Sequence, residues 1–285
     1  MLRTSPYLAE SCSGGSPVAC HNHAMRVLIL GGTADANRLA ERLSDAGGFE
    51  VVLSLAGRTK DPGHAAVPTR IGGFGGAQGL AAWLRAHGID GLIDATHPFA
   101  SRMRNNAAQA ADRAGIPLAR LERPAWAPQP GDDWVGVADR AEAARAVEAV
   151  DPTGSVLLTI GRRELEPFAA LRQYHWVVRT IEPPAPDPGF DSVTYVHERG
   201  PFDRHAERAL MKRHDVGLLV TKASGGAHTR AKLDAARDHG VTVVMIQRPA
   251  EPASMGHTLH SLDDALAWLD GHASPAPSDA TERGV

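Results

Sequence analysis

Short runs of Val, Ile and Leu alternate with amphipathic stretches along most of the 285-residue chain. Unbroken apolar runs indicate strands buried on both faces, and the amphipathic stretches between them indicate helices. Such alternation is typical of an α/β fold with a parallel sheet between two layers of helices. The expected strands are 26–30, 50–56, 91–95, 117–121, 134–137, 155–160, 176–181, 216–221 and 241–246. The expected helices are 34–45, 77–87, 101–114, 140–150, 204–214, 227–239 and 262–270.

The strand-and-helix pattern occurs twice, and three short matches relate the two copies. The second member of each match begins 129, 126 and 125 residues after the first. Three matches in one order predict two Rossmann-like, three-layer halves with mostly parallel sheets and a ligand cleft between them. The turn-rich sequence near Asp151 predicts the boundary, so the halves would span 25–150 and 151–271. The matches pair 27–31 with 156–161, 91–97 with 217–222 and 121–124 with 246–249.

Both ends of the chain differ in composition from this core. Residues 1–24 are polar and turn-forming, which predicts a disordered extension or an extraneous remnant ahead of a functional start at Met25. Residues 272–285 are rich in Ala, Pro and Ser, which predicts a disordered tail. Cys12 and Cys20 are the only cysteines, so a disulfide framework is not expected and a cytoplasmic setting fits.

Overall composition narrows the class of protein further. The chain has 43% hydrophobic and 22% charged residues, as an ordinary globular protein does. A formal net charge of −3 without a basic stripe argues against nucleic-acid binding. No apolar run reaches the roughly 18–20 residues of a membrane-spanning helix. His21 and His23 lack a third ligand nearby, so we expect no metal site.

A glycine turn, Gly31-Gly32, follows the first expected strand, and Thr33 and Ala34 then open a helix. Glycines let the backbone turn tightly and approach an anion, and free N–H groups at the helix start favour negative charge. The third glycine of the full dinucleotide fingerprint is absent. The turn predicts a site for nucleotide phosphates, with a plain turn between strand and helix as the alternative.

Arg58 and Thr59 lie just beyond the second expected strand, where no acidic residue stands. A free ribose 2′-hydroxyl usually meets Asp or Glu at this point, whereas a 2′-phosphate is bound by Arg. A guanidinium can bind phosphate through two hydrogen bonds, and a hydroxyl adds another. These residues predict NADPH rather than NADH, with a solvent-exposed loop arginine as the alternative.

The third expected strand ends in Asp94-Ala95-Thr96-His97. Ligands of open α/β sheets bind at this carboxyl edge, so we expect Thr96 and His97 to contact the cofactor. His97 is also the candidate for a catalytic proton shuttle. A loop histidine that only bonds backbone groups is the alternative, and Asp94 is expected to order the turn.

The second half carries cations and glycines at the corresponding strand ends. Lys222 and Ser224 precede Gly225 and Gly226 at an expected helix start, and Arg162 follows an earlier strand. Such groups favour anions, which predicts a substrate with several carboxylates; a glycine-rich turn with an incidental lysine is the alternative. No nucleophile or Walker A motif is present. Hydride transfer requires mainly orientation from the protein, so sparse catalytic residues fit a reductase.

Five segments together resemble the precorrin-6A reductases of cobalamin (vitamin B12) biosynthesis, over residues 25–269. They are 28–33, 94–100, 120–126, 160–165 and 221–226. The resemblance implies an oxidoreductase acting on CH–CH bonds that reduces the precorrin-6A macrocycle to precorrin-6B with NADPH. It further implies that hydride reaches C18 of the ring and a proton reaches C19. The tetrapyrrole would be the small-molecule partner, and other enzymes of the pathway could be partners too.

The resemblance also implies roles for residues already singled out. His97 would lie near the nicotinamide and is the candidate proton donor, with bound water as the alternative. The cofactor would be held by Gly31, Gly32, Thr33, Arg58 and Thr59. Substrate carboxylates or, alternatively, cofactor phosphates would be held by Arg162, Lys222, Ser224, Gly225 and Gly226. Two other readings stay open: a two-half tetrapyrrole enzyme without nicotinamide, and a non-catalytic nucleotide-sensing module.

Overall fold

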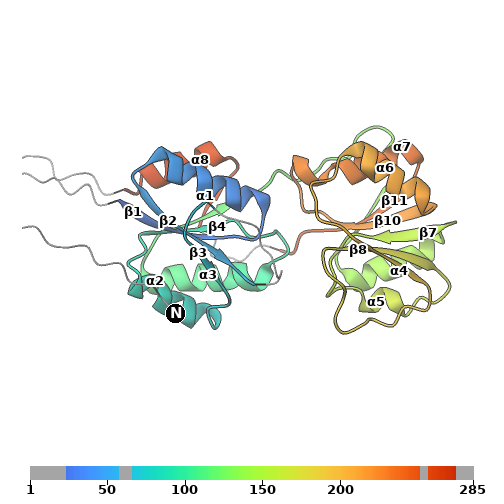
Figure 1. The fold of residues 1–285 in the computed structure, drawn as a ribbon, viewed down its shortest axis with the longest axis horizontal. Coiled ribbons are helices and arrows are strands. Elements are labelled where there is room, and N and C mark those ends of the chain that lie inside the picture. Colours follow the sequence, from blue (N-terminus) through green and yellow to red (C-terminus); the bar gives the residue numbers. More distant parts are fainter. Residues whose placement is uncertain (1–23, 58–65, 251–255, 274–285) are drawn as a thin grey trace, which may run out of the picture.

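The computed structural model describes residues 24–57, 66–250 and 256–273. These residues form two α/β halves that lie side by side along the long axis (Figure 1). Each half has a six-stranded sheet, and every strand pair is parallel. Helices cover both faces of each sheet, so the expected pair of Rossmann-like, three-layer halves is confirmed.

The first half is built on a sheet with the strand order β12-β5-β4-β1-β2-β3. Helices α1 (Ala34–Ala46) and α8 (Leu262–Asp270) pack on one face, and α2 (Gly76–Ala86) and α3 (Ser101–Ala114) on the other. Its strands are β1 (Met25–Leu30), β2 (Phe49–Leu55), β3 (Thr69–Ile71), β4 (Gly91–Asp94), β5 (Leu118–Leu121) and β12 (His257–Leu259).

The second half repeats this arrangement with the order β6-β11-β10-β7-β8-β9. Helices α4 (Arg140–Val150) and α5 (Glu166–Ala169) cover one face, and α6 (Arg204–Arg213) and α7 (Ala231–His239) the other. Its strands are β6 (Trp134–Val137), β7 (Ser155–Leu158), β8 (His175–Thr180), β9 (Val193–His197), β10 (Val216–Lys222) and β11 (Thr242–Ile246).

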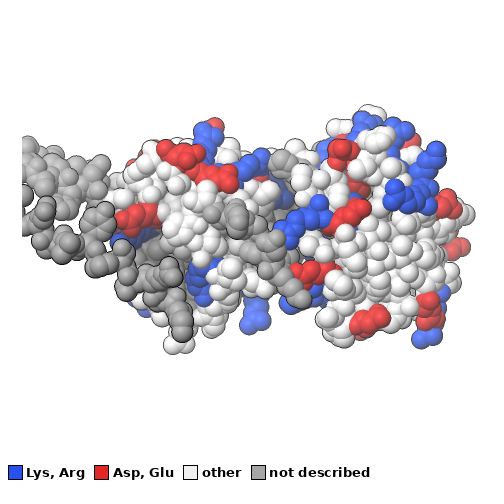
Figure 2. Space-filling view, in the orientation of Figure 1, with Lys and Arg blue, Asp and Glu red and all other residues white. Residues whose placement is uncertain are grey.

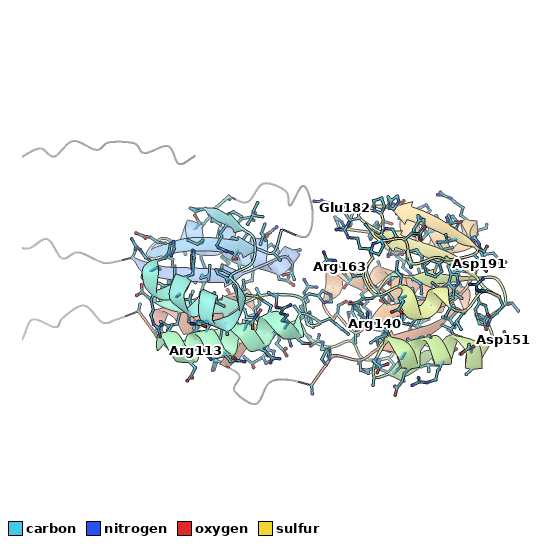
Figure 3. The ribbon with its side chains drawn as sticks, turned by 90° about the horizontal axis from the view of Figure 1, so that it is seen from below. Arg113, Arg140, Asp151, Arg163, Glu182 and Asp191 are labelled. Atoms are coloured by element: carbon cyan, nitrogen blue, oxygen red, sulfur yellow. The ribbon has the colours of Figure 1, made fainter. Side chains whose placement is uncertain are left out.

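In each sheet, the strand at one edge pairs with a strand that lies more than a hundred residues away in the chain. After β5 the chain crosses to the second half, where β6 pairs with β11; after β11 it returns, and β12 pairs with β5. The expected boundary near Asp151 therefore does not divide the sheets, because β6 and α4 already belong to the second half. Figure 3 shows Asp151 at the far end of that half, away from the first. The last helix, α8, packs on the first half beside α1.

All nine expected strands and seven expected helices form, and the described residues contain four further elements. The strands β3 and β12 have three residues each, too few for an apolar pattern to be visible. The strand β9 lies at a sheet edge with only partly buried side chains, and α5 has four residues. The helix expected from residue 227 begins at Ala231, because Ala227–Thr229 form a 3-10 turn.

The return of the chain after β11 makes β12 part of the hydrophobic core of the first half. Leu259 is 1% exposed and packs in the cluster that also holds Leu121 and Leu269. We predict that Leu259→Ala lowers the free energy of unfolding by about 2–5 kcal/mol, because it leaves a cavity in a packed core. Chemical denaturation of the full chain measures this.

The control is Ile71→Ala at the opposite edge of the same sheet, where the side chain is 60% exposed. That substitution should change the free energy of unfolding by less than about 0.5 kcal/mol. Equal effects of the two substitutions would show that β12 is not integral to the core.

Candidate functional site

The cavity between the two halves lies at the carboxyl ends of the second sheet and is bordered by a loop of the first. It has a volume of about 470 Å³. The first half contributes the loop after β4, and the second contributes the ends of β7, β8 and β10 and the start of α7. Crevices at the carboxyl ends of parallel strands are where α/β proteins bind ligands. The first-half lining is His97, Phe99 and Ala100.

The glycine turn after β1 leaves open space beside its backbone. Gly31 packs so closely on β2 that an added Cβ would lie 2.7 Å from Leu53. Gly32 has φ +107°, and an added Cβ there would meet nothing within 4 Å. Ala34 then begins α1, two residues after Gly32.

Thr33 fixes this turn to the neighbouring strand. Its Oγ1 accepts from the N–H of Ala36 at 3.1 Å, which caps α1, and donates to the carbonyl of Ala95 at 2.9 Å. The hydroxyl of Thr33 therefore serves the fold. The backbone N–H groups at the start of α1 remain the feature that could bind an anion. Arg58 and Thr59 lie outside the described residues.

Asp94 orders the turn after β4, as expected. Its Oδ1 accepts from the backbone N–H of Thr96 at 3.0 Å and from the Thr96 hydroxyl at 2.6 Å. The carboxylate is 1% exposed and lies 3.4 Å from the guanidinium of Arg120, which is 2% exposed. Thr96 is thus held by Asp94, and this rigid turn presents His97 to the cavity.

His97 is a neutral imidazole in this environment. Burial lowers its pKa to about 3, and the positive charges of Lys222 and Arg123 act in the same direction. Its Nδ1 accepts from the N–H of Phe99 at 3.3 Å, so the ring proton lies on Nε2. Neutral His97 can donate a hydrogen bond from Nε2, but at neutral pH it holds no imidazolium proton to give.

In the second half, cations and carboxylates come together after β7. Arg162 donates to Glu182 at 2.7 Å, and Lys222 forms an ion pair with Glu164. Figure 3 shows Arg163 and Glu182 on the side of the second half that faces the first. On the face drawn in Figure 2, Lys and Arg lie among Asp and Glu over both halves.

Of residues 223–226 after β10, only Ser224 reaches the cavity, and Thr229 lines it further along the chain. Ser224 is 5% exposed. Gly225 and Gly226 instead pack on the crossing after β5: an added Cβ on Gly225 would lie 2.4 Å from the carbonyl of Pro124. Gly226 donates its N–H to the same carbonyl at 3.2 Å and accepts from Trp126 Nε1 at 2.7 Å. The two glycines thus join the halves, and their expected contact with substrate stays a prediction.

The sequence did not single out Lys232, which also lines the cavity. It lies in the second position of α7, on the same buried stripe as Leu233, Ala235 and Ala236. A lysine on an otherwise apolar helix stripe was the available signal. The pKa of Lys232 is lowered to about 8, chiefly by burial and then by the charge of Arg179, while Glu207 acts in the opposite direction.

Two further observations limit the kind of site. No group of three or more His, Cys, Asp or Glu side chains within 24–57, 66–250 and 256–273 could hold a metal ion. None of the helices in these ranges has the length and apolar character needed to cross a membrane.

Comparison with known proteins gives consistent matches over nearly the whole folded chain. The family model described as Precorrin-6x reductase CbiJ/CobK matches residues 26–270. A precorrin-6A reductase of Rhodococcus erythropolis is 48% identical over 246 residues, covering 86% of this chain and 97% of the relative. A solved CobK precorrin-6A reductase is 40% identical, with a TM-score of 0.82, covering 89% of this chain and 99% of that structure. A cobalt-precorrin-6A reductase of Priestia megaterium is 30% identical over 237 residues, covering 78% and 90%.

The environment of His97 predicts an unusual titration. A free imidazole titrates near pH 6.5, but we expect the His97 ring to stay neutral, with the proton on Nε2, down to about pH 4. Long-range ¹H–¹⁵N NMR of the ring nitrogens between pH 5 and 8 measures this, with His97→Gln to assign the signal. A His97 signal that titrates near pH 6.5 would contradict the assigned protonation state.

Proposed function

The chain belongs to the precorrin-6x reductase CbiJ/CobK family, as its motifs indicated, and we propose from this premise that it reduces precorrin-6A to precorrin-6B with NADPH. The observation that carries the proposal is the cavity of about 470 Å³ between the halves, with His97 on one wall and several cations on the other. A reductase must bring a hydride donor and an acceptor face to face, and this cavity lies between two such binding edges.

The residues of the first half fit a dinucleotide. The open space beside Gly32 and the N-terminus of α1 suit a pyrophosphate. Asp35, in the first turn of α1, would repel phosphate if its charge were uncompensated. Burial raises its pKa, but Arg123 and Arg38 outweigh burial and lower the pKa overall, and both form ion pairs with the carboxylate. Its negative charge is therefore compensated at the place where phosphates would lie.

When bound, NADPH supplies the hydride, and the side chains around the cavity orient the two reactants. His97 Nε2–H would donate to the nicotinamide amide or to a substrate carboxylate. Phe99 adds an apolar surface beside it, with the Lys222 ammonium 5.1 Å from the ring centroid. Expulsion of water by these packed groups would strengthen the electrostatic contacts in the site.

The second half would bind the acetate and propionate arms of the macrocycle. Arg162, Arg163 and Lys222 line the cavity together with Ser224. Arg162 and Lys222 are held by Glu182 and Glu164 respectively, so the cations are positioned before substrate binds. A positioned guanidinium binds carboxylate through two hydrogen bonds with little further loss of side-chain freedom.

The metal-free macrocycle is the proposed substrate. The relative named precorrin-6A reductase is 48% identical, whereas the relative named cobalt-precorrin-6A reductase is 30% identical. Because both names belong to members of one family, the higher identity favours precorrin-6A over its cobalt complex.

Turnover by the purified full chain tests the activity. We expect oxidation of NADPH, followed by absorbance, that depends on precorrin-6A and yields precorrin-6B. Failure to oxidise NADPH with either precorrin-6A or its cobalt complex would reject the proposal. NADPH deuterated at C4 and used in ordinary water would mark the carbon that receives the hydride. Label at C18 of the product would support the expected site of hydride addition, and label at C19 would show that the hydride and the proton go to the opposite carbons.

The preference for NADPH is expected to depend on Arg58. We predict that Arg58→Ala raises KM for NADPH about tenfold or more and leaves KM for NADH nearly unchanged, because it removes a charge-assisted contact to the 2′-phosphate. Steady-state kinetics with both cofactors measure this. The exposed Arg213 on α6 provides the matched control, Arg213→Ala. An equal effect of Arg58→Ala on both cofactors would show that Arg58 does not bind the 2′-phosphate.

A further inference from the structure

Lys232 is a buried cation of the cavity without an acidic partner, whereas Arg163, which also has no ion pair among the described residues, is exposed to solvent. Lys232 is 7% exposed. Arg162 is paired with Glu182, Lys222 with Glu164, and Arg179 with Glu207. Among the described residues, no hydrogen-bond acceptor or carboxylate lies within bonding distance of Lys232, and its Nζ lies 5.7 Å from the centroid of the Trp126 ring. Buried ammonium groups are normally paired, so this one requires an explanation.

Glu207, whose charge acts on Lys232, already has a partner in Arg179. Glu207 accepts two hydrogen bonds of 2.9 Å from Arg179, and both side chains are almost fully buried, at 3% and 8% exposure. This two-bond geometry uses both carboxylate oxygens of Glu207. The guanidinium of Arg179 also lies 4.1 Å from the centre of the Phe202 ring, which holds it in place.

The surroundings of Lys232 make its proton easier to lose than that of an ordinary lysine. Its pKa is lowered to about 8 by burial and then by Arg179, with Glu207 opposing. Lys232 is also in the first turn of α7, where the positive end of the helix dipole disfavours an ammonium charge. At neutral pH the group therefore carries a proton, yet it is a far stronger acid than a solvated lysine.

Lys232 lines the same cavity as His97, and a buried hydroxyl, Thr221 Oγ1, lies there too without a partner among the described residues. We propose that Lys232 is the catalytic acid of the reduction, the group that protonates the macrocycle when the hydride is added. This rests on the proposed function. It replaces His97, whose neutral ring has no proton to give at neutral pH.

The proposed step balances in atoms and electrons. The hydride adds to one carbon of the C18–C19 double bond, and NADPH becomes NADP⁺. The electron pair released from that double bond, delocalised over the conjugated ring, takes a proton from the Lys232 ammonium at the other carbon. A C–H bond forms, an N–H bond breaks, and Lys232 is left as a neutral amine that solvent reprotonates after product leaves.

Two substitutions separate acid catalysis from charge. Lys232→Met removes both the proton and the charge, whereas Lys232→Arg keeps the charge on a group that does not lose its proton. We expect both to lower kcat about 100-fold or more, the lower end of what a positioned acid contributes, with KM values nearly unchanged. Lys212→Met, at an exposed position on α6, is the matched control and should keep native kcat.

The pH dependence of kcat gives a second readout. The acid must be protonated, so native kcat should fall as pH rises through about 8, and this limb should be missing in Lys232→Arg. Glu207 of α6 lies behind Arg179. The other titratable or charged groups that line the cavity are His97 after β4, Arg162, Arg163 and Glu164 after β7, Arg179 on β8, Glu182 after β8 and Lys222 on β10. All of these remain in the Lys232 variants, so a limb that persists in Lys232→Arg would overturn the proposal.

Thermal unfolding without ligands supplies a readout independent of turnover. Removal of an unpaired buried charge should stabilise the fold, so Lys232→Met should melt at the native temperature or roughly 2–4 °C above it. A large fall in melting temperature would mark Lys232 as a structural residue and overturn the proposal. So would a kcat within about tenfold of native in either variant. If the native chain itself does not turn over, the proposed function fails first, and that outcome is distinct from native turnover with active variants.

Discussion

The guanidinium of Arg248 joins the two places where the chain crosses between the halves. It donates to the carbonyls of Ala223 at 2.9 Å, Arg123 at 2.9 Å and Ser224 at 3.3 Å. Arg123 begins the first crossing and Arg248 the second, so one side chain bonds to both. Arg123 in turn forms an ion pair with Asp35 at the start of α1. These contacts fix the orientation of the halves, and the cavity keeps its shape because its two walls cannot separate without breaking them.

Within that cavity, most of the buried or partly buried cations are paired with carboxylates of the protein. A buried ion pair gains little net stability, but loss of one member is costly because the other is left uncompensated. Arg162, Lys222 and Arg179 each have a carboxylate partner, which holds the cation in position. A polycarboxylate ligand would compete with these resident carboxylates at the rim, where Glu182 and Glu164 are partly exposed, and far less at the nearly buried Glu207.

Much of the fold follows from the sequence because the central strands are buried on both faces and read as unbroken apolar runs. The strands that the sequence did not reveal are β3, β9 and β12, which lie at sheet edges. They are either three residues long or only partly buried, so they lack an unbroken apolar run. The domain boundary failed for a different reason. A turn at Asp151 marks a local break, but the partner of β6 is β11, more than a hundred residues later, and only tertiary pairing reveals it. The third sequence match, at 121–124 and 246–249, in fact marks the two crossings.

The site shows the same division between local and tertiary information. Cations next to glycine turns were visible in the sequence, and Arg162, Lys222 and Ser224 do line the cavity. Which groups are already paired, and that Lys232 is not, depends on contacts between distant elements. The duplicated turns make the point most directly. Gly32 and Gly161 have almost the same φ, +107° and +105°, yet Thr33 follows one and Arg162 the other. Thr33 uses its hydroxyl within the fold, so that turn offers backbone N–H groups, whereas Arg162 extends a guanidinium toward the cavity. The same turn geometry therefore presents backbone N–H groups in one half and a guanidinium in the other, because the residue that follows the glycine differs.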